Sequence, residues 1–249
     1  MKGSLPAELL EVFARASVAE LVTVDRGAHP VVWPLAPRYH AAEGCIDVTV
    51  VRGDLDQAGD MADDAHVALL FSQDAPMVLV QGTAGIEAGD TEVDVHVRPE
   101  RIYVWPGADL EREPELYDAH VDEVRSAHNE EPEVGHVAAE GGASAWDARI
   151  DDLGAAHPTV VLAFVGPDGF PFAVRVPVSA DRAAGVVRID ADPVGAPIEP
   201  GLGCLCAHAG GGCFDVVGDL EEAGGRWVLR PHRVVGDGGR AAEHASPGR

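Results

Sequence analysis

Apolar and polar residues alternate with a period of two in many short runs along this chain, a pattern typical of strands with one buried face. Clear examples are the segments 77–90 (MVLVQGTAGIEAGD) and 214–225 (FDVVGDLEEAGG), each of which indicates a hairpin whose first strand ends at a glycine before an acidic turn. The 29 glycines and 18 prolines interrupt these runs often enough to separate many short strands. The pattern therefore predicts a mainly β protein with a few short helices.

Two stretches have helical spacing instead. Residues 5–13 place apolar side chains on one face, and Ser4 before them is a candidate N-cap. Residues 144–154 (SAWDARIDDLG) do the same with three large apolar side chains, which are Trp146, Ile150 and Leu153. Each stretch precedes a series of predicted strands, so we expect a short helix at two equivalent points of the chain.

The strand pattern itself occurs twice. The segments 95–105 (VHVRPERIYVW) and 227–236 (WVLRPHRVVG) share an R-P-x-R core, 132 positions apart. Because proline cannot donate a hydrogen bond to a ladder, we expect Pro99 and Pro231 to separate the last two strands of each copy. Further upstream, the segments 20–37 and 159–180 each hold a strand, an Asp/Gly turn and a second strand with a proline.

Other matched positions keep the same order. Gly82 corresponds to Gly218, 136 positions later, and Gly27 to Gly169, 142 positions later, with a slip of one residue around that turn. An offset that changes so little along the chain favours internal duplication over two unrelated β segments.

The duplication predicts four regions. Residues 1–106 form a first module and 146–240 a second, shortened module, while 107–145 connect them and 241–249 form a disordered tail. The connector holds eleven Asp or Glu residues against two Arg, and apolar residues at helical spacing predict a solvated helix around Leu116, Val121 and Val124.

The first copy resembles the pyridoxamine 5'-phosphate oxidase-like, FMN-binding split-barrel family over residues 5–105. DRGAHPVVWPLAP looks like the family's first strand pair, IDVTVVRGDLDQAGDMADDAHVALLF like its third strand, phosphate-binding turn, helix and fourth strand, and LVQGTA like its V-x-G strand. The resemblance implies two split β-barrels that pair, with the isoalloxazine ring in the groove between them. In most relatives two chains supply the barrels, whereas here one chain supplies both as an internal pseudo-dimer.

The resemblance implies a flavin-binding protein, namely an FMN-dependent oxidoreductase, and it assigns no catalytic residue. Arg52 stands where a flavin phosphate would need a cation, but a surface arginine at a strand end is also common without any ligand. Relatives often carry a phosphate-clamping lysine near the start of the helix, and Gln57 replaces it here. The candidate cofactor contacts are Trp33, Pro34, Val50, Val51, Arg52 and Gln57 from the first module, with Arg175 and His208 from the second.

Several alternatives stay open at this point. The cofactor could be FAD, a deazaflavin serving a reductase, or haem held by a haem-handling protein on the same fold; the chain could also be a cofactor-free relic. The second copy passes through prolines and glycines where the first has its predicted helix, so we expect at most one cofactor per chain.

Three of the four cysteines lie close together in the second copy. Cys204, Cys206 and His208 are spaced by two and would share one face of a strand, with Cys213 after a glycine-rich turn. No second pair of zinc ligands follows at the usual spacing, so we expect buried thiols and no metal.

The charge balance narrows the partners. Forty-two acidic residues against 18 basic ones give a formal charge of -24, which disfavours nucleic acid and anionic membranes. Only Lys2 is a lysine, which is typical of halophilic proteins, although a GC-rich genome has a similar effect. Without an apolar leader or a long apolar run, we expect a cytoplasmic protein that binds a small-molecule cofactor and substrate, with a homodimer as an option.

Overall fold

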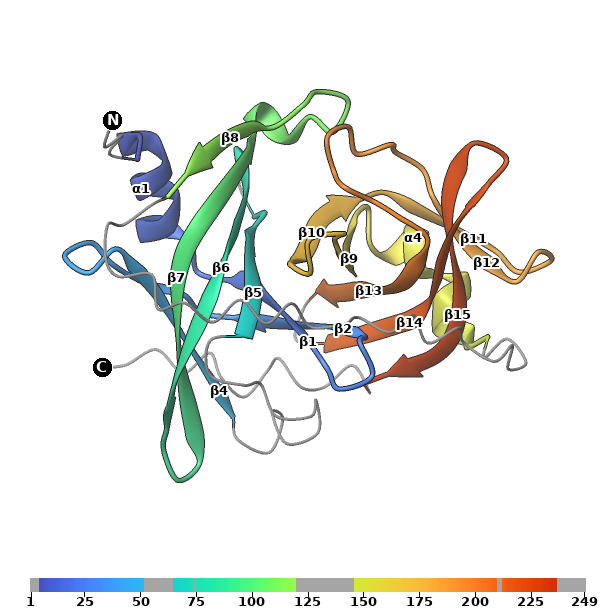
Figure 1. The fold of residues 1–249 in the computed structure, drawn as a ribbon. Helices are drawn as coiled ribbons and strands as arrows, with labels where there is room; N and C mark the ends of the chain where they lie inside the picture. Colours follow the sequence, from blue (N-terminus) through green and yellow to red (C-terminus); the bar gives the residue numbers. More distant parts are fainter. Residues whose placement is uncertain (1–4, 52–64, 74, 120–145, 210–211, 237–249) are drawn as a thin grey trace.

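The computed structural model describes residues 5–51, 65–73, 75–119, 146–209 and 212–236. It is mainly β, with two antiparallel sheets side by side, as the sequence predicted (Figure 1). Within these ranges, no helix is both long enough and apolar enough to cross a membrane.

The first module (blue to green in Figure 1) holds one helix before its sheet. Its elements are α1 (Ala7–Arg15), β1 (Ala19–Val24), β2 (Pro30–Leu35), β3 (Arg38–His40), β4 (Cys45–Val51), β5 (Ala65–Phe71), β6 (Met77–Ala88), β7 (Glu92–Trp105), η1 (Pro106–Ala108) and β8 (Glu115–Asp118). The strand order is β2-β1-β5-β6-β7-β4-β3, and β8 also pairs with β7.

The second module (yellow to red) repeats this plan. Its elements are α3 (Ala148–Asp151), α4 (Leu153–Ala156), β9 (Val160–Val165), β10 (Pro171–Val176), β11 (Val178–Asp181), β12 (Val186–Ile189), β13 (Gly201–Ala209), β14 (Gly212–Ala223) and β15 (Arg226–Val235). The order β10-β9-β13-β14-β15-β12-β11 matches the first sheet strand for strand, so the repeat seen in the sequence is also a repeat of topology.

Each module contains the same β-bulge in its longest hairpin. A register shift precedes Gly82 between β6 and β7, and another precedes Gly218 between β14 and β15. Each glycine lies opposite the proline of an R-P-x-R core, Pro99 or Pro231. A Cβ at either glycine would lie 2.0 Å from the carbonyl oxygen of the arginine before that proline, so only glycine fits without a shift of the backbone.

These bulges correct two expectations. Pro99 and Pro231 lie inside β7 and β15 and do not separate strands. A bulge already interrupts the ladder at this point, so a residue without an N–H is tolerated there. For the same reason β6 and β14 do not end at their glycines, but continue to Ala88 and Ala223 before the turn.

The turns between the first two strands of each module also match more closely than expected. The backbone N–H of Asp25 donates to the carbonyl of His29 at 2.9 Å, and that of Gly166 donates to Phe170 at 2.8 Å. The left-handed residue is Ala28 (φ 61°) in one turn and Gly169 (φ 79°) in the other. Gly169 therefore corresponds to Ala28 and not to Gly27, and the expected slip of one residue is wrong.

The short helices differ from the expectation in detail. Helix α1 begins at Ala7 with Pro6 at the N-cap position, and Ser4 lies outside the described residues. The second stretch forms two single turns, α3 and α4, and Ile150 and Leu153 are buried as predicted. The N-cap of α3 is Asp147, whose carboxylate accepts from the backbone N–H of Arg149 at 2.8 Å.

Where the connector is described, it contains the end of the 3-10 helix η1 but no α-helix. Leu116 belongs to strand β8, which pairs with β7, and 56% of its surface is exposed. The helix prediction is wrong at Leu116, because the local spacing of apolar residues does not reveal that residues 115–118 pair with β7. Val121 and Val124, like the tail 241–249, lie outside the described residues.

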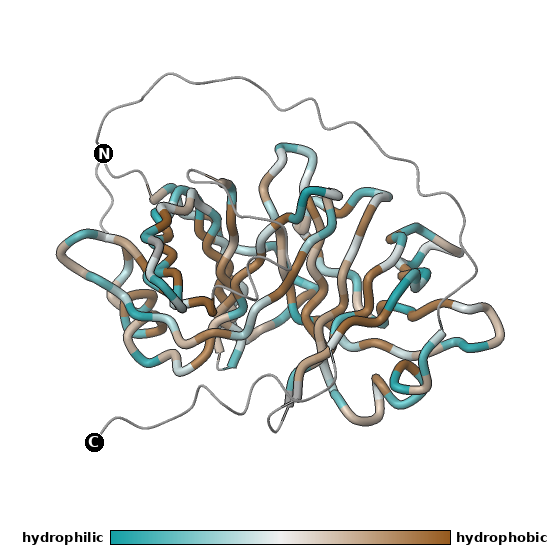
Figure 2. The backbone as a smooth tube through the Cα atoms, turned by 90° about the horizontal axis from the view of Figure 1, so that it is seen from below, coloured by the Kyte–Doolittle hydropathy of each residue, from teal (hydrophilic) through white to brown (hydrophobic). Residues whose placement is uncertain are grey.

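The two sheets share one hydrophobic region. One face of the first sheet, together with α1, encloses the core of module 1, whereas Val22, Val32 and Leu70 on its other face join the core of module 2. In Figure 2, hydrophobic segments follow the strands, and hydrophilic segments are common in the connecting loops and hairpin tips.

The second arginine of each R-P-x-R core reaches the turn of the other module. Arg101 donates to Asp168 at 2.6 Å, and Arg233 lies 3.8 Å from Asp25. These reciprocal contacts make the interface approximately two-fold symmetric.

Candidate functional site

A polar cluster interrupts the apolar interface between the modules. Its centre is Glu20, whose side chain is fully buried on β1. Alternation along the strand sends Ala19 and Leu21 into the core of module 1, and therefore turns Glu20 and Val22 towards module 2.

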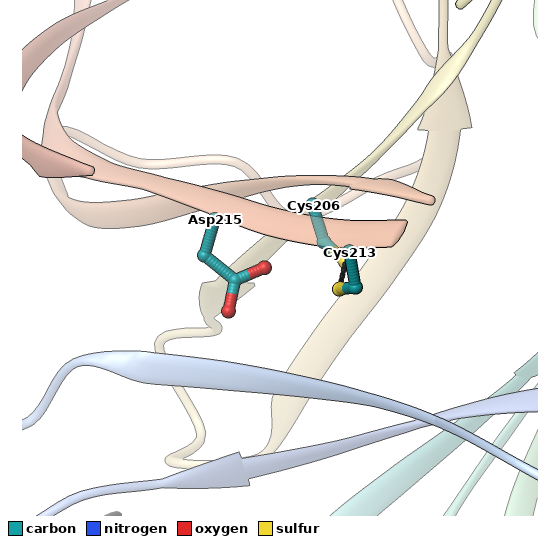
Figure 3. A group of neighbouring side chains, drawn as sticks. All are labelled: Cys206, Cys213 and Asp215. Carbon is teal, nitrogen blue, oxygen red and sulfur yellow. Dashed lines mark hydrogen bonds between the residues drawn. The ribbon is translucent and has the colours of Figure 1, made fainter. Parts of the chain in front are cut away.

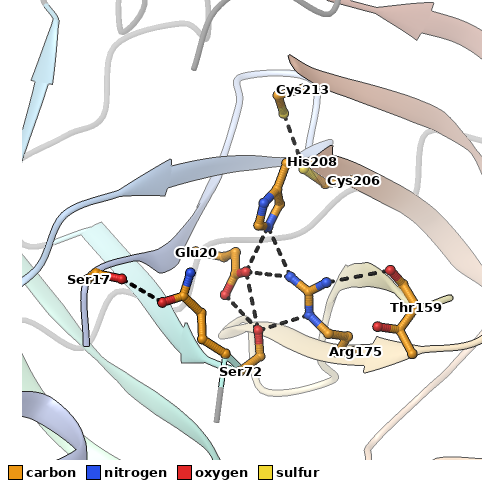
Figure 4. Close-up of polar contacts among 9 residues, drawn as sticks. Ser17, Glu20, Ser72, Thr159, Arg175, Cys206, His208 and Cys213 are labelled. Atoms are coloured by element: carbon orange, nitrogen blue, oxygen red, sulfur yellow. Dashed lines mark hydrogen bonds and ion pairs between the residues drawn. The ribbon is translucent and has the colours of Figure 1, made fainter. Parts of the chain in front are cut away.

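Three side chains surround the carboxylate of Glu20 (Figure 4). Arg175 on β10 donates from Nη2 to Oε1 at 2.7 Å, and Nε2 of His208 on β13 lies 2.8 Å from the same oxygen. Ser72, just after β5, donates to Glu20 at 3.2 Å and accepts from Nε of Arg175 at 2.9 Å. Glu20 and Ser72 belong to module 1, so the cluster joins the two modules.

The electrostatics of the cluster are those of a satisfied buried ion pair. Removing a carboxylate from water costs several kcal/mol unless a cation and hydrogen-bond donors replace the solvent. Arg175 and Ser72 supply both for Glu20, and Arg175 also donates to the carbonyl of Thr159. Nearby, burial lowers the pKa of His157, and His208 and Arg175 lower it further.

The cluster occurs on one side of the approximate two-fold axis only. The ladders of the two modules make Val161 the counterpart of Glu20 and Pro34 the counterpart of Arg175. Ser72 directly follows β5 at the position that corresponds to His208 on β13. The positions equivalent to this ion pair in the other half of the interface are therefore both aliphatic.

The structure divides the sequence-predicted residues between different places. It brings Arg175 and His208 together, with 3.0 Å between Nη2 and Nε2, and Pro34 is the ladder neighbour of Glu20. These three residues lie at the module interface.

The remaining described candidates lie elsewhere. Trp33 points to the opposite face of β2, where its indole Nε1 donates to Oγ1 of Thr23 at 3.2 Å. Val50 is buried in the core of module 1, and Val51 is half-buried at the end of β4. Arg52 and Gln57 lie outside the described residues, so the proposed phosphate contacts stay predictions.

Sequence reasoning missed Glu20 and Ser72. The signal for Glu20 was an acidic residue inside the apolar run AELVTV, at a position where the strand pattern requires a buried side chain. Ser72 carried no comparable signal.

The connection between β12 and β13 in module 2 agrees with the sequence. Residues 190–200, between β12 and β13, contain no helix. The buried thiols also agree, since Cys204 and Cys206 are fully buried. Burial and neighbouring acidic groups raise the pKa of the Cys45 thiol to about 11.

The described candidate contacts concern the ring of a flavin and not its phosphate. Pro34 and Val51 are half-buried and keep surface that an aromatic ring can cover. A phosphate needs a cation or several donors, and the charge of Arg175 is already matched by Glu20. A hollow of about 560 Å³ beside α1 is bordered by Ser72, but its lining has three acidic residues, Glu8, Glu11 and Glu115, against one cation, Arg15, which pairs with Glu11.

Comparison with known proteins gives a distant likeness. No protein-family model and no curated protein matches the chain. Among solved structures, a candidate pyridoxamine 5'-phosphate oxidase from Listeria innocua is 14% identical and covers 41% of this chain and 98% of its own, with a TM-score of 0.32. A Clostridium acetobutylicum protein of the pyridoxinephosphate oxidase family, related to general stress protein 26, is 10% identical over 45% and 92% of the two chains, with a TM-score of 0.35.

A third solved structure matches over most of the chain. MrkH of K. pneumonia, in its apo state, covers 91% of this chain and 85% of its own at 8% identity, with a TM-score of 0.26.

Proposed function

We propose that this protein binds one flavin, FMN, per chain and acts as a flavin-dependent oxidoreductase. The observation that carries the proposal is that module 2 places Arg175 and His208 against module 1 beside Pro34, the side-by-side arrangement that the split-barrel resemblance implies. The ring would cover Pro34 and Val51, and the phosphate would lie near Arg52 and Gln57.

The chain's own residues would orient the cofactor. The pair formed by Glu20 and Arg175 holds the two modules in one arrangement, and Ser72 fixes both partners of that pair. When bound, a flavin supplies the hydride or electron transfer, and the protein positions it and excludes water.

The test is an equilibrium titration of the full chain in concentrated salt, monitored by flavin fluorescence. FMN should bind with one site per chain, and riboflavin, which lacks the phosphate, should bind about tenfold more weakly or worse. Arg52→Gln should reduce the affinity for FMN to that for riboflavin. The matched control is Arg182→Gln, which removes an exposed module 2 arginine paired with Asp151. Failure of FMN, FAD and a deazaflavin to bind below millimolar concentration would refute the proposal.

A second candidate function is a cofactor-free binding or structural module. It is favoured by one observation: Glu20 already neutralises the charge of Arg175 through their ion pair. Absence of flavin binding, together with an unchanged unfolding temperature when FMN is added, would support it. A Soret band on haem addition that disappears in His208→Ala would instead indicate haem handling, although Nε2 of His208 already contacts Glu20 and Arg175.

A further inference from the structure

A second polar cluster lies in module 2, on the same face of β13 as His208. It consists of Cys206 on β13 and of Cys213 and Asp215 on β14 (Figure 3). One ligand atom from each residue, two sulfurs and a carboxylate oxygen, lies within 4.8 Å of the others. The two sulfurs are 3.5 Å apart.

The hairpin register explains why the three side chains meet. Cys206 stands directly opposite Asp215, and Cys213 stands opposite His208, one step along the same face. Residues at such positions on an antiparallel pair project to one side, so the cluster depends on backbone pairing and not on a mobile loop.

The matching positions of module 1 show that this chemistry is a departure from the repeated pattern. The ladders place Leu70, Met77 and Leu79 where module 2 has Cys206, Cys213 and Asp215. All three module 1 side chains are almost fully buried in the shared hydrophobic region. Module 2 thus has three side chains that can ligate a metal at positions where module 1 has three apolar interface side chains.

We propose that Cys206, Cys213 and Asp215 form a zinc site. Tetrahedral Zn²⁺ with bonds of about 2.3 Å to sulfur keeps two thiolates roughly 3.8 Å apart, close to the spacing between Cys206 and Cys213. Two thiolates and one carboxylate leave the fourth position for water or another ligand. Soft thiolates also select Zn²⁺ over the hard Mg²⁺ and Na⁺ that an acidic surface attracts.

Zinc binds cysteine as the thiolate, so both thiols must lose their protons when the metal binds. Zinc binding would replace the two thiol protons by two zinc–sulfur bonds and release both protons to solvent. No oxidant is involved.

The site is tested with reduced, chelator-treated full-length protein in concentrated NaCl. Zn²⁺ should bind with one site per chain in competition with a chromophoric chelator, releasing about two protons into weak buffer. Co²⁺ should give thiolate-to-cobalt charge-transfer absorption. Absence of the stoichiometric zinc, or a Co²⁺ spectrum without the thiolate band, would overturn the proposal.

The zinc affinities of single variants distinguish the three proposed ligands from a neighbouring cysteine. Cys206→Ser, Cys213→Ser and Asp215→Asn should each weaken zinc by more than the roughly 10- to 100-fold typical of losing a residue that supports a ligand. Cys204→Ser, two residues from Cys206 on the same strand, should leave zinc binding unchanged. Equal losses in Cys204→Ser and Cys206→Ser would contradict the assignment, as would an Asp215→Asn variant with full affinity.

Loss of fold is controlled in two ways. Circular dichroism should show the β signal of the wild type in each variant, and Asp215→Asn keeps the size and shape of the side chain. The opposing result is that Cys206 and Cys213 form a disulfide in air while the reduced protein takes up no zinc. That result would identify a redox-active cysteine pair and refute the zinc site.

Discussion

The two modules have the same strand order and the same bulge, but they use equivalent positions on their facing surfaces differently. Module 1 places Glu20 where module 2 has Val161, and module 2 places Arg175 where module 1 has Pro34. At three further positions, module 1 has Leu70, Met77 and Leu79 where module 2 has Cys206, Cys213 and Asp215. Backbone features that define the fold are therefore shared by both copies, whereas the chemistry of their interface is not.

The largest expected effect on stability comes from replacing Glu20 of module 1 with valine, the residue at the equivalent position of module 2. Glu20→Val leaves Arg175 buried without its carboxylate and should lower the free energy of unfolding by about 3 to 5 kcal/mol. The double variant Glu20→Val, Arg175→Met should recover most of this loss, since an apolar pair can replace a buried ion pair. Chemical denaturation measures both. A loss below about 1 kcal/mol in the single variant, as for an exposed pair, would show that the pair does not stabilise the interface.

The bulge glycines test the shared part of the comparison. Gly82→Ala and Gly218→Ala each bring a Cβ to 2.0 Å from a backbone oxygen and should cost about 2 kcal/mol. Gly85→Ala, whose Cβ would meet its nearest atoms at 3.8 Å, is the matched control and should be almost neutral. The losses of stability are measured from the denaturant midpoints of the three variants. Clearly unequal losses for Gly82→Ala and Gly218→Ala would mean that the two bulges are not equivalent.

The smallest expected effect concerns pH and has opposite signs in the two modules. In module 2, burial lowers the pKa of His157, so its contribution to stability is present above pH 6.5 and is lost as pH falls. In module 1, the hydrogen bond to Asp47 raises the pKa of His96, so its contribution is present below pH 6.5 and is lost as pH rises.

Single variants separate the two contributions. Relative to the wild type, His157→Ala should become more stable as pH falls below 6.5, and His96→Ala should become less stable. Free energies of unfolding measured on both sides of this pH give the comparison. Parallel shifts in the two variants would contradict it.

The sequence predicted the repeat, the mainly β class and the absence of a helix in 190–200, because strand alternation and turn residues are local signals. It misplaced Pro99 and Pro231 because a bulge depends on the partner strand, which local pattern does not specify. It matched Gly169 to Gly27 by residue type, although the shared feature is a left-handed backbone that Ala28 adopts.

The candidate site was predicted only in part, because local patterns do not specify how the two sheets pack. Arg175 and His208 were identified as contributions of module 2, and they do meet at the interface. Trp33 and Val50 point into module 1, because register decides which face of a strand points to a partner, and their role as cofactor contacts stays a prediction. The partnership with Glu20 joins residues 155 positions apart and depends on how two sheets pack.

The covalent connection between the modules has a genetic consequence. In a dimer of identical chains, every substitution at the interface appears on both sides of the axis, so a buried glutamate would have to find a cation twice. Here each half is encoded separately, and one side can keep an ion pair while its mirror position stays aliphatic. The interface of this protein can therefore change one half at a time.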